Sequence, residues 1–335
     1  MPPSHTFRQY RLEHGLPVLG VSAPIALSPN QVEIQIQAAS LNYRDLLTLE
    51  DAKQQGLPPL SDCMGIISRV GIDVADWKVG DRVCANFFPT WIDGPFTPQA
   101  YSTALGGGGT PGVLAESLAV SADSLVAIPD YLSAEGAATL PCAALTAWHA
   151  LIERGNLKAG ETVLVQGTGG VALFGLQIAA ALGAKTIVIS SSDEKLARTQ
   201  ALGAWKTVNY KTDPDWAKTI LAITNGRGVD HILELGGPET YDRSITAIAF
   251  GGRIHQIGVL TGFNHQPNTL PLQFKNASIH GICVGSVEMF KRMNTFFKLH
   301  RIQPVIDRIF SFERAKDAYS YLRSGQHFGK VVIAH

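Results

Sequence analysis

The stretch Val163-Leu164-Val165-Gln166-Gly167-Thr168-Gly169-Gly170-Val171-Ala172 decides the fold of this chain. It starts as an apolar run rich in β-branched residues, breaks into glycines, and continues into a helix-like segment at 173–182. A strand, a tight turn and a helix in this order, with glycines and a small residue spaced G-x-G-x-x-A, are typical of a dinucleotide-binding unit. The stretch therefore predicts a parallel sheet with a cofactor at this turn.

Each small residue of the motif has a separate task. Gly167 permits the sharp turn, Gly169 allows the backbone to approach a pyrophosphate, and Ala172 lets the helix pack against the sheet. The free N–H groups of the helix N-terminus favour a phosphate. We assign to the cofactor site the turn residues Gly167, Thr168, Gly169, Gly170 and Val171.

The end of the next strand selects the type of dinucleotide. A strand at 186–190 ends in Ser190-Ser191-Ser192, with Lys195 one turn further on. NAD sites usually place a carboxylate here for the adenosine ribose, whereas hydroxyls and a cation favour a 2′-phosphate. We expect NADP(H), with NAD(H) possible, because Ser192 or Asp193 also has the simpler interpretation of a helix cap and Lys195 that of a solvated side chain.

Length, charge and cysteine usage exclude several classes of protein. A chain of 335 residues predicts two domains. Lys plus Arg and Asp plus Glu are 28 each, so no net charge favours nucleic acid or a membrane surface, and no apolar run is long enough to span a bilayer. The N-terminus shows no secretion signal, and four scattered cysteines fit a reduced compartment. We expect a cytoplasmic protein that acts on a small molecule.

The order of the predicted elements indicates two kinds of domain. Residues 1–124 are β-rich, with strands at 31–38, 61–71 and 114–120 and a long loop at 89–112. Strands and helices then alternate, which predicts a doubly wound parallel sheet. Its strands lie at 162–166, 186–190, 207–210, 231–235, 252–257 and 278–284, and helices at 287–300 and 313–324 precede a closing strand at 330–333.

Several motifs together carry a resemblance that covers almost the whole chain. They are Ala39-Ser40-Leu41-Asn42-Tyr43-Arg44-Asp45, Val79-Gly80-Asp81-Arg82-Val83, Leu140-Pro141-Cys142-Ala143-Ala144-Leu145-Thr146-Ala147-Trp148, the glycine turn, Asn209-Tyr210 and His327-Phe328-Gly329-Lys330. In their order and spacing the chain resembles a medium-chain dehydrogenase/reductase, similar to the zinc-free quinone-oxidoreductase-like and alcohol-dehydrogenase-like branches. The resemblance implies a GroES-like catalytic domain at 1–124 and 288–335, a Rossmann domain at 125–287, and a cofactor in the cleft between them.

The resemblance also extends the cofactor site. Relatives place a tyrosine beside the 2′-phosphate, at the position of Tyr210 here. We expect further cofactor contacts from Tyr43, Thr146, Gly236, Ile257, Gly258, Val259, Val284, Gly285, Phe328 and Lys330.

Zinc-dependent members of the family place Cys-x-His-x-Asp where this chain has Asn42-Tyr43-Arg44-Asp45, and a His-Glu pair where it has Ser61-Asp62. Only Cys142 stands at the position of a third ligand, and the 89–112 loop lacks the cysteines of a structural zinc lobe. A catalytic zinc needs three protein ligands. We therefore predict no zinc, and Cys142 as a small core residue.

Without a metal to polarise a plain carbonyl, we expect an acceptor that is already activated, such as a quinone, an enone or a conjugated aldehyde. Asn42 and Tyr43 supply donors for the oxyanion that forms, and Arg44 supplies a cation. Other roles remain open: Asn42 holding a loop, Tyr43 contacting the cofactor, Arg44 pairing with Asp45. Also open are a zinc-free dehydrogenase acting on another carbonyl or alcohol, and a non-catalytic NADP(H)-binding sensor or structural protein.

The strand at 278–284 is predicted to lie at the edge of the nucleotide sheet, since the chain leaves that domain directly after it. It carries no lysine, proline or glutamate, the residues that usually protect an edge. We expect a homodimer through this strand, as the resemblance also implies.

Overall fold

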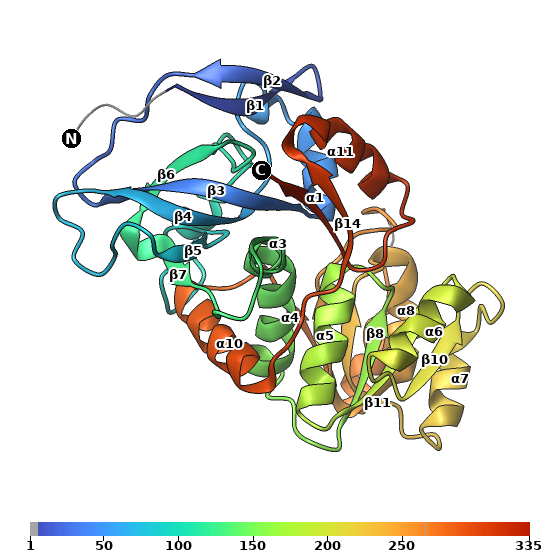
Figure 1. The fold of residues 1–335 in the computed structure, drawn as a ribbon. Coiled ribbons are helices and arrows are strands. Elements are labelled where there is room, and N and C mark those ends of the chain that lie inside the picture. The colour runs from blue at the N-terminus through green and yellow to red at the C-terminus, as the bar shows by residue number, and fades with distance from the viewer. Residues whose placement is uncertain (1–5, 265) are drawn as a thin grey trace. The chain divides into compact units, whose positions relative to one another are not determined.

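A computed structural model describes residues 6–264 and 266–335. The chain folds into two compact units (Figure 1). Unit 1 joins the residues up to Leu145 with Val284–His335, and unit 2 is Thr146–Cys283. The nucleotide-type unit is thus inserted into a unit built from both ends of the chain, the arrangement that the resemblance implies.

The unit boundary lies further along the chain than the expected position between residues 124 and 125. Strand β7 (Leu125–Ala127) pairs with β5 (Arg82–Ala85), and helix α3 (Ala134–Ala138) packs on β3 (Gln31–Leu41). Both elements complete unit 1, so its first segment ends at Leu145. The second boundary falls between residues 283 and 284 rather than between 287 and 288.

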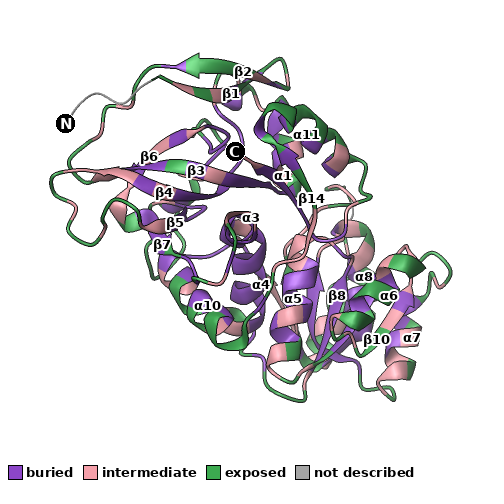
Figure 2. Cartoon of the chain, in the orientation of Figure 1, coloured by how far each residue is buried: buried purple, intermediate pink, exposed green. Residues whose placement is uncertain are grey.

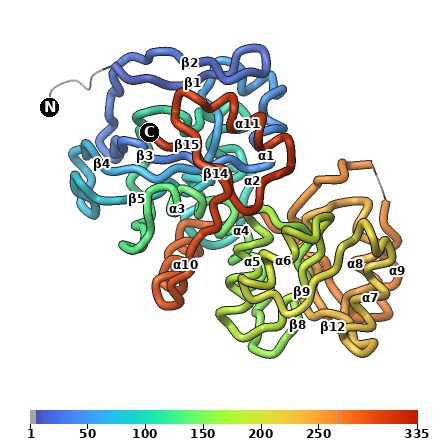
Figure 3. Tube along the Cα trace, turned by 45° about the vertical axis from the view of Figure 1, so that its right-hand side comes forward, coloured from blue at the N-terminus to red at the C-terminus, as the bar shows by residue number. Residues whose placement is uncertain are grey.

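Unit 1 contains a seven-stranded sheet in the order β14-β15-β3-β4-β5-β7, with β6 also on β3, and a separate β1-β2 hairpin. The remaining strands are β1 (Phe7–Glu13), β2 (Leu16–Ser22), β4 (Asp62–Val70), β6 (Ser117–Ser121), β14 (Ile306–Ser311) and β15 (Lys330–Ala334). The other helices are α1 (Tyr43–Leu47), α2 (Pro98–Tyr101), α10 (Val287–His300) and α11 (Ala315–Arg323). In Figure 3 the C-terminal strand β15 lies beside β3, with which it pairs antiparallel.

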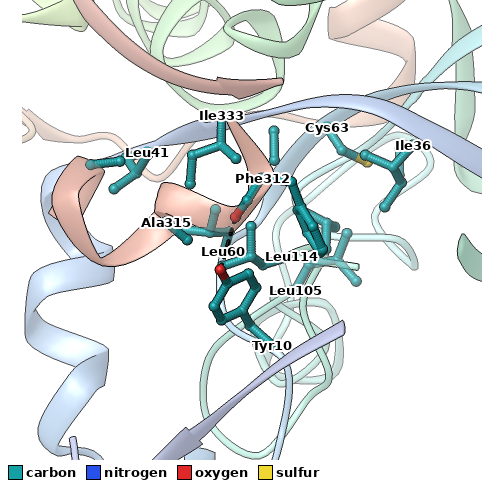
Figure 4. Close-up of a cluster of buried hydrophobic side chains, with 14 of the residues drawn as sticks. Tyr10, Ile36, Leu41, Leu60, Cys63, Leu105, Leu114, Phe312, Ala315 and Ile333 are labelled. Carbon is teal, nitrogen blue, oxygen red and sulfur yellow. Dashed lines mark hydrogen bonds between the residues drawn. The ribbon is translucent and has the colours of Figure 1, made fainter. Parts of the chain in front are cut away.

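The hydrophobic core of unit 1 also joins the two ends of the chain (Figure 4). The Tyr10 hydroxyl donates to the Phe312 carbonyl at 2.9 Å, and their rings meet edge to face with centroids 5.2 Å apart. Leu41, Leu60 and Ile333 are buried in the same cluster. Burial of each such apolar side chain contributes roughly 1.5–3 kcal/mol, which holds the C-terminal segment on the N-terminal sheet.

Unit 2 is a six-stranded sheet in the order β10-β9-β8-β11-β12-β13, and every neighbouring pair is parallel. The strands are β8 (Thr162–Gln166), β9 (Lys185–Ser190), β10 (Lys206–Asn209), β11 (Val229–Glu234), β12 (Ile248–Gln256) and β13 (Ser278–Gly281). The helices are α5 (Gly170–Ala181), α6 (Asp193–Ala201), α7 (Trp216–Ile223), α8 (Tyr241–Ala247) and α9 (Leu270–Lys275). The predicted doubly wound sheet is confirmed. Helix α4 (Leu145–Trp148), between π-helical turns at Leu140–Ala144 and His149–Arg154, crosses the unit boundary.

Strands β8 and β11 are buried along their whole length (Figure 2). Helix α5 packs tightly on β11 at Gly175, where an added Cβ would lie 2.2 Å from Cδ1 of Leu233. Ala172, to which the sequence motif gives the packing role, is fully buried as well. None of the helices in the described part of the chain has the length and apolar character needed to cross a bilayer.

Candidate functional site

The predicted cofactor residues of unit 2 lie at one end of its sheet, where the strands finish. Gly167–Val171 follow β8, Ser191 and Ser192 follow β9, Tyr210 follows β10, Gly236 follows β11, and Ile257–Val259 follow β12. Because the strands are parallel, these positions all lie at their carboxyl ends. The strand order reverses between β8 and β11, and such a switch point is where open α/β sheets bind ligands.

The glycine turn has the conformation that its sequence predicts. Gly167 lies at φ +80°, in the left-handed region, and its N–H donates to the Ile189 carbonyl at 2.7 Å. Gly169 is the N-cap of α5, and no atom lies within 4 Å of a Cβ built on either glycine. Open space thus adjoins the backbone at the N-terminus of a twelve-residue helix, as an approaching phosphate requires.

A buried polar network that sequence reasoning missed ties β8 to β11 at the switch point. The Glu234 carboxylate accepts from Gln166 Nε2 at 2.7 Å, from Gly236 N at 3.1 Å and from Gly237 N at 3.0 Å. The hydroxyls of Thr240 and Ser244 also donate to it. A polar residue at the end of an otherwise apolar strand was the available signal. Glu234 thereby fixes the turn that carries Gly236.

The end of β9 shows the helix cap that was one of the two interpretations considered for its serines. Ser192 is the N-cap of α6, and its Oγ accepts from Lys195 N at 3.3 Å. Its hydroxyl hydrogen is not used by that bond, so capping leaves a donor for a phosphate. Ser190 is buried, whereas Tyr210 is 41% exposed at the neighbouring strand end. Asn209 donates to Asp193 at 2.8 Å and joins the two segments.

Gly258 allows two strand ends to meet. A Cβ on Gly258 would lie 2.0 Å from the Leu235 carbonyl oxygen, and the N–H groups of Ile257 and Gly258 both donate to the Glu234 carbonyl at 3.0 Å. The glycine is therefore required by backbone packing, whatever contact it makes with a cofactor.

In unit 1 the structure brings Asn42 together with Lys330. Antiparallel pairing of β15 with β3 places Val331 opposite Leu41, and Lys330 Nζ donates to Asn42 Oδ1 and to the Leu41 carbonyl, both at 2.5 Å. Lys330 is 4% exposed and Asn42 9% exposed. Burial lowers the pKa of Lys330, against the opposing charges of Asp62 and Asp45.

Buried acceptors extend this cluster. Ser61 Oγ donates to Asp62 Oδ1 at 2.6 Å, and Asp62 Oδ2 accepts from Cys142 N at 3.0 Å. Asn42 Nδ2 lies 3.4 Å from Ser61 Oγ. Burial raises the pKa of the Asp62 carboxyl, and burial together with Asp62 raises the pKa of the Cys142 thiol. We call Asn42, Ser61, Asp62, Cys142 and Lys330 the Lys330 cluster.

The two neighbours of Asn42 differ in their surroundings. Tyr43 is 42% exposed at the first position of α1, so its phenol is accessible. Arg44 donates to the Leu105 carbonyl at 2.7 Å and to Asp45 at 3.4 Å, and its guanidinium lies 4.5 Å from the centre of the Phe87 ring. The structural role considered for Arg44, pairing with Asp45, is therefore the one that the structure shows.

The remaining predicted cofactor residues are Thr146, Val284, Gly285 and Phe328. Thr146, Val284 and Phe328 are buried. Val284 lies at φ +50°, which is strained for a β-branched residue, and such strain is concentrated at functional sites. Asn86 Nδ2 donates to the Gly285 carbonyl at 3.2 Å.

The Lys330 cluster does not fit a catalytic zinc. An amide, a serine–aspartate pair and a thiol of raised pKa stand at the ligand positions, and a buried ammonium donates to one of them. Zinc needs three N, S or O ligands, with any cysteine as thiolate. Among the residues that the structure describes, no three His, Cys, Asp or Glu side chains are arranged to hold a metal ion.

Comparison with known proteins gives two family models, described as "Alcohol dehydrogenase GroES-like domain" at residues 28–130 and "Zinc-binding dehydrogenase" at residues 170–298. The chain is 43% identical over 320 residues to a zinc-type alcohol dehydrogenase-like protein of Schizosaccharomyces pombe, covering 92% of both chains. It is 31% identical over 319 residues to a phenolphthiocerol/phthiocerol polyketide synthase of Mycobacterium tuberculosis, covering 91% of this chain but 14% of that protein.

A solved structure from Sinorhizobium meliloti 1021, assigned as an alcohol dehydrogenase, is 40% identical and superposes with a TM-score of 0.93 over 100% of both chains. Together with the fold and the glycine turn, these matches identify the class of protein. The chain belongs to the medium-chain dehydrogenase/reductase superfamily and is an alcohol-dehydrogenase-like oxidoreductase with the fold that binds NAD(P)(H).

Proposed function

We propose that the protein is an NADPH-dependent reductase that transfers hydride, without zinc, to an activated acceptor such as a quinone, an enone or a conjugated aldehyde. The observation that carries the proposal is the Lys330 cluster, in which the Asn42 amide stands where relatives have a metal ligand and accepts a hydrogen bond from the buried Lys330 ammonium. Such a cluster offers hydrogen bonds and not a Lewis acid, which favours an acceptor carbon that conjugation already activates.

The chain's own residues then have defined tasks. The bound nicotinamide supplies the hydride. When the hydride adds to the acceptor carbon, an electron pair moves to the conjugated oxygen, and the Asn42 Nδ2–H that Ser61 does not accept donates to the resulting oxyanion. The accessible Tyr43 phenol, or water through it, supplies the proton that completes the reduction. Arg44 is given a structural task, since its Nη2 donates to the Leu105 carbonyl and to Asp45.

Nucleotide binding is assigned to unit 2. The α5 N-terminus at Gly169–Val171 would hold the pyrophosphate, and Ser191, Ser192, Lys195 and Tyr210 would offer the donors for a 2′-phosphate. A carboxylate for the ribose is not needed for this choice of cofactor, because the 2′-phosphate takes the hydrogen bonds instead.

The comparisons support reduction without selecting its acceptor. A similar segment belongs to polyketide synthases, several of which are named highly reducing. The names "zinc-type" and "Zinc-binding dehydrogenase" favour a second candidate, a dehydrogenase acting on a simple carbonyl or alcohol. A third candidate is an NADP(H)-binding sensor or structural protein without turnover.

Loss of NADPH absorbance separates these candidates. The purified protein is given NADPH and, in turn, naphthoquinones, cyclic enones, cinnamaldehyde-type aldehydes and saturated aldehydes. Turnover confined to the first three groups supports the proposal. Equal turnover of saturated aldehydes supports the second candidate, and tight NADPH binding without turnover supports the third.

Metal content is measured on the same preparation, purified without a histidine tag. We expect far less than one zinc per chain and activity that survives a chelator, because the Lys330 cluster offers one thiol of raised pKa and an ammonium where the ligands would lie. One tightly held zinc per chain, removed together with activity, would contradict the zinc-free proposal.

A further inference from the structure

Lys330 is an uncommon feature of a protein interior. Its ammonium donates to the Leu41 carbonyl and to Asn42 Oδ1, each 2.5 Å away. Lysine is almost never fully buried unless it is paired, because desolvating the ammonium is costly. The desolvation cost of the Lys330 ammonium indicates that it has a specific role in the neighbouring site.

The ammonium determines which way the Asn42 amide points. A lysine ammonium has three donors and no acceptor, so the atom facing it must be the amide oxygen. The Asn42 Nδ2 hydrogens consequently point away from Lys330. One donates to Ser61 Oγ at a long 3.4 Å, and Ser61 Oγ in turn donates to Asp62 at 2.6 Å, a carboxyl whose pKa burial raises and the Asn42 side chain lowers. The Asn42 main-chain N–H donates to Asp45 Oδ2 at 2.7 Å, which fixes the backbone as well.

We propose that Lys330 is a positioning residue that holds the Asn42 amide so that the N–H that Ser61 does not accept is directed to the reacting oxygen. This inference rests on the proposed function of Asn42. The pairing with Lys330 also polarises the amide and strengthens its N–H groups as donors. The fixed orientation of the amide also restricts the class of substrates. Nδ2 can only donate, so it recognises a substrate oxygen that offers a lone pair, such as that of a conjugated carbonyl.

A double-mutant cycle tests the positioning role. The four proteins are the wild type, Lys330→Met, Asn42→Ala and the double variant, each assayed for kcat, for KM of the acceptor and for NADPH affinity by fluorescence. Asn42→Ala should lower kcat by about a hundredfold, the usual effect of removing one oxyanion donor. Lys330→Met should lower kcat by about tenfold in the wild type and by less than about twofold in Asn42→Ala, because the two residues act as a unit.

Other outcomes overturn the inference. An equal loss of kcat in both backgrounds would show that Lys330 acts independently of Asn42. A tenfold weaker NADPH affinity with kcat intact would show that Lys330 binds the cofactor directly, the role that the sequence predicts for it. Lys330→Arg, which keeps a cationic donor, should recover part of the lost activity if positioning is correct.

Asn42→Asp covers the case in which an alanine variant folds poorly. Its carboxylate has the shape of the amide and forms an ion pair with Lys330, but it has no N–H group to donate. We expect a folded protein with kcat as low as that of Asn42→Ala. Wild-type kcat in Asn42→Asp would overturn the claim that the amide N–H is the useful group.

Lys275→Met is the matched control. Lys275 is a second partly buried lysine, in unit 2, and its Nζ donates to the carbonyls of Ile245, Thr246 and Ile248 at 3.0, 2.7 and 2.8 Å. Its removal should lower thermal stability without coupling to Asn42 in kcat. Coupling as strong as that of Lys330 would mean that the cycle reports general destabilisation, and the inference would fail.

One readout needs no turnover and separates this inference from the proposed function. The side-chain amide of Asn42, identified in the spectrum of ¹⁵N-labelled protein by its loss in Asn42→Asp, should give one sharp pair of signals in the wild type. Lys330→Met should broaden, double or shift that pair. If no acceptor is reduced but this change is seen, the positioning role stands and the proposed reaction fails. If the pair is unchanged, Lys330 does not hold the amide.

Discussion

Gln166 and Glu234, the last residues of two neighbouring parallel strands, meet side chain to side chain with 2.7 Å between Nε2 and the carboxylate. Gln166 Oε1 in turn accepts from the N–H groups of Leu235 and Gly236 at 3.1 and 2.9 Å. The pair thus joins the two strand ends at which the sheet order reverses, beside the glycine turn. The turn that carries Gly236 therefore depends on a buried polar network at this switch point.

The first prediction concerns that network. In Glu234→Gln an amide N–H₂ group would face donors from Gln166, Ser244 or the 236–237 backbone, leaving buried donors unpaired at roughly 1–3 kcal/mol each. We expect a clear fall in the denaturant midpoint and NADPH affinity reduced by about tenfold, because the turn at Gly236 loses its anchor. Asp242→Asn, on the exposed surface of α8, is the control. Unchanged affinity in Glu234→Gln would show that the turn does not need this carboxylate.

The second prediction is a preference for NADPH over NADH. A charge-assisted contact to the 2′-phosphate contributes about 1.5–3 kcal/mol, which is about tenfold to a hundredfold in affinity. Lys195→Met and Tyr210→Phe should each weaken NADPH and leave NADH unaffected, as measured by fluorescence titration. Lys206→Met is the control. Lys206 is the first residue of β10, so it lies at the amino end of this strand, whereas Tyr210 follows its carboxyl end. Equal affinities for both cofactors in the wild type would refute the preference.

The nucleotide unit was predictable from sequence because its signals are local. The β-branched run before Gly167 and the glycines after it determine strand, turn and helix within twenty residues. Hydrophobic periodicity predicted helix α10 with its observed bounds, Val287–His300. Edge strand β13 came out shorter than expected, because its ladder to β12 covers only Ser278–Gly281 before the chain departs.

The unit 1 cluster was not predictable, because its contacts are distant in sequence. Asn42 and Lys330 are 288 positions apart, and only the pairing of β15 with β3 brings them together. A lysine after a glycine has the pattern of a surface or phosphate-binding cation, and no feature of the sequence shows that it turns inward. The unit boundary was misplaced for a similar reason, since the pairing of β7 with β5 depends on tertiary structure.

The third prediction concerns acid stability. His231, His255 and His280 lie on three neighbouring strands of unit 2, with 3.2 Å between His231 Nδ1 and His255 Nε2 and the rings of His255 and His280 edge to face. The surrounding charged groups are Glu161, Asp230, Arg154, Arg253 and His149. Burial lowers the pKa of all three histidines, that of His255 from 6.5 to about 2.

A histidine that stays neutral when folded binds a proton only after unfolding, so it costs stability as the pH falls from 6.5 toward 2. His255 therefore contributes a slope of about 1.4 kcal/mol per pH unit in that window, and no effect above it. His255→Phe should therefore make the fall in unfolding free energy between pH 6 and about 4 shallower by one proton. His300→Gln, on the exposed end of α10, is the control. An unchanged slope in His255→Phe would contradict the assignment.

The last prediction is a homodimer, which we propose is formed by strand β13 pairing with its copy. β13 ends the strand order of the unit 2 sheet. Ile282 N donates to the Gln256 carbonyl at 3.0 Å, and β13 pairs in register with β12. Alternation along a parallel ladder then directs the backbone groups of Ser278, His280 and Ile282 to β12 and those of Ile279 and Gly281 to the open side.

Proline at Ile282 and proline at Ile279 should have different effects, because the two N–H groups point to opposite sides of the strand. Ile282→Pro would remove a donor that unit 2 uses itself, so its effect would mix unfolding with dissociation. Ile279→Pro removes only an N–H on the open side, where an edge strand tolerates proline. We expect Ile279→Pro to retain its thermal stability and NADPH affinity yet to elute as a 36.0 kDa monomer in light scattering at micromolar concentration, whereas the wild type has twice that mass. A monomeric wild type, or a dimer that survives Ile279→Pro, would exclude pairing through this edge.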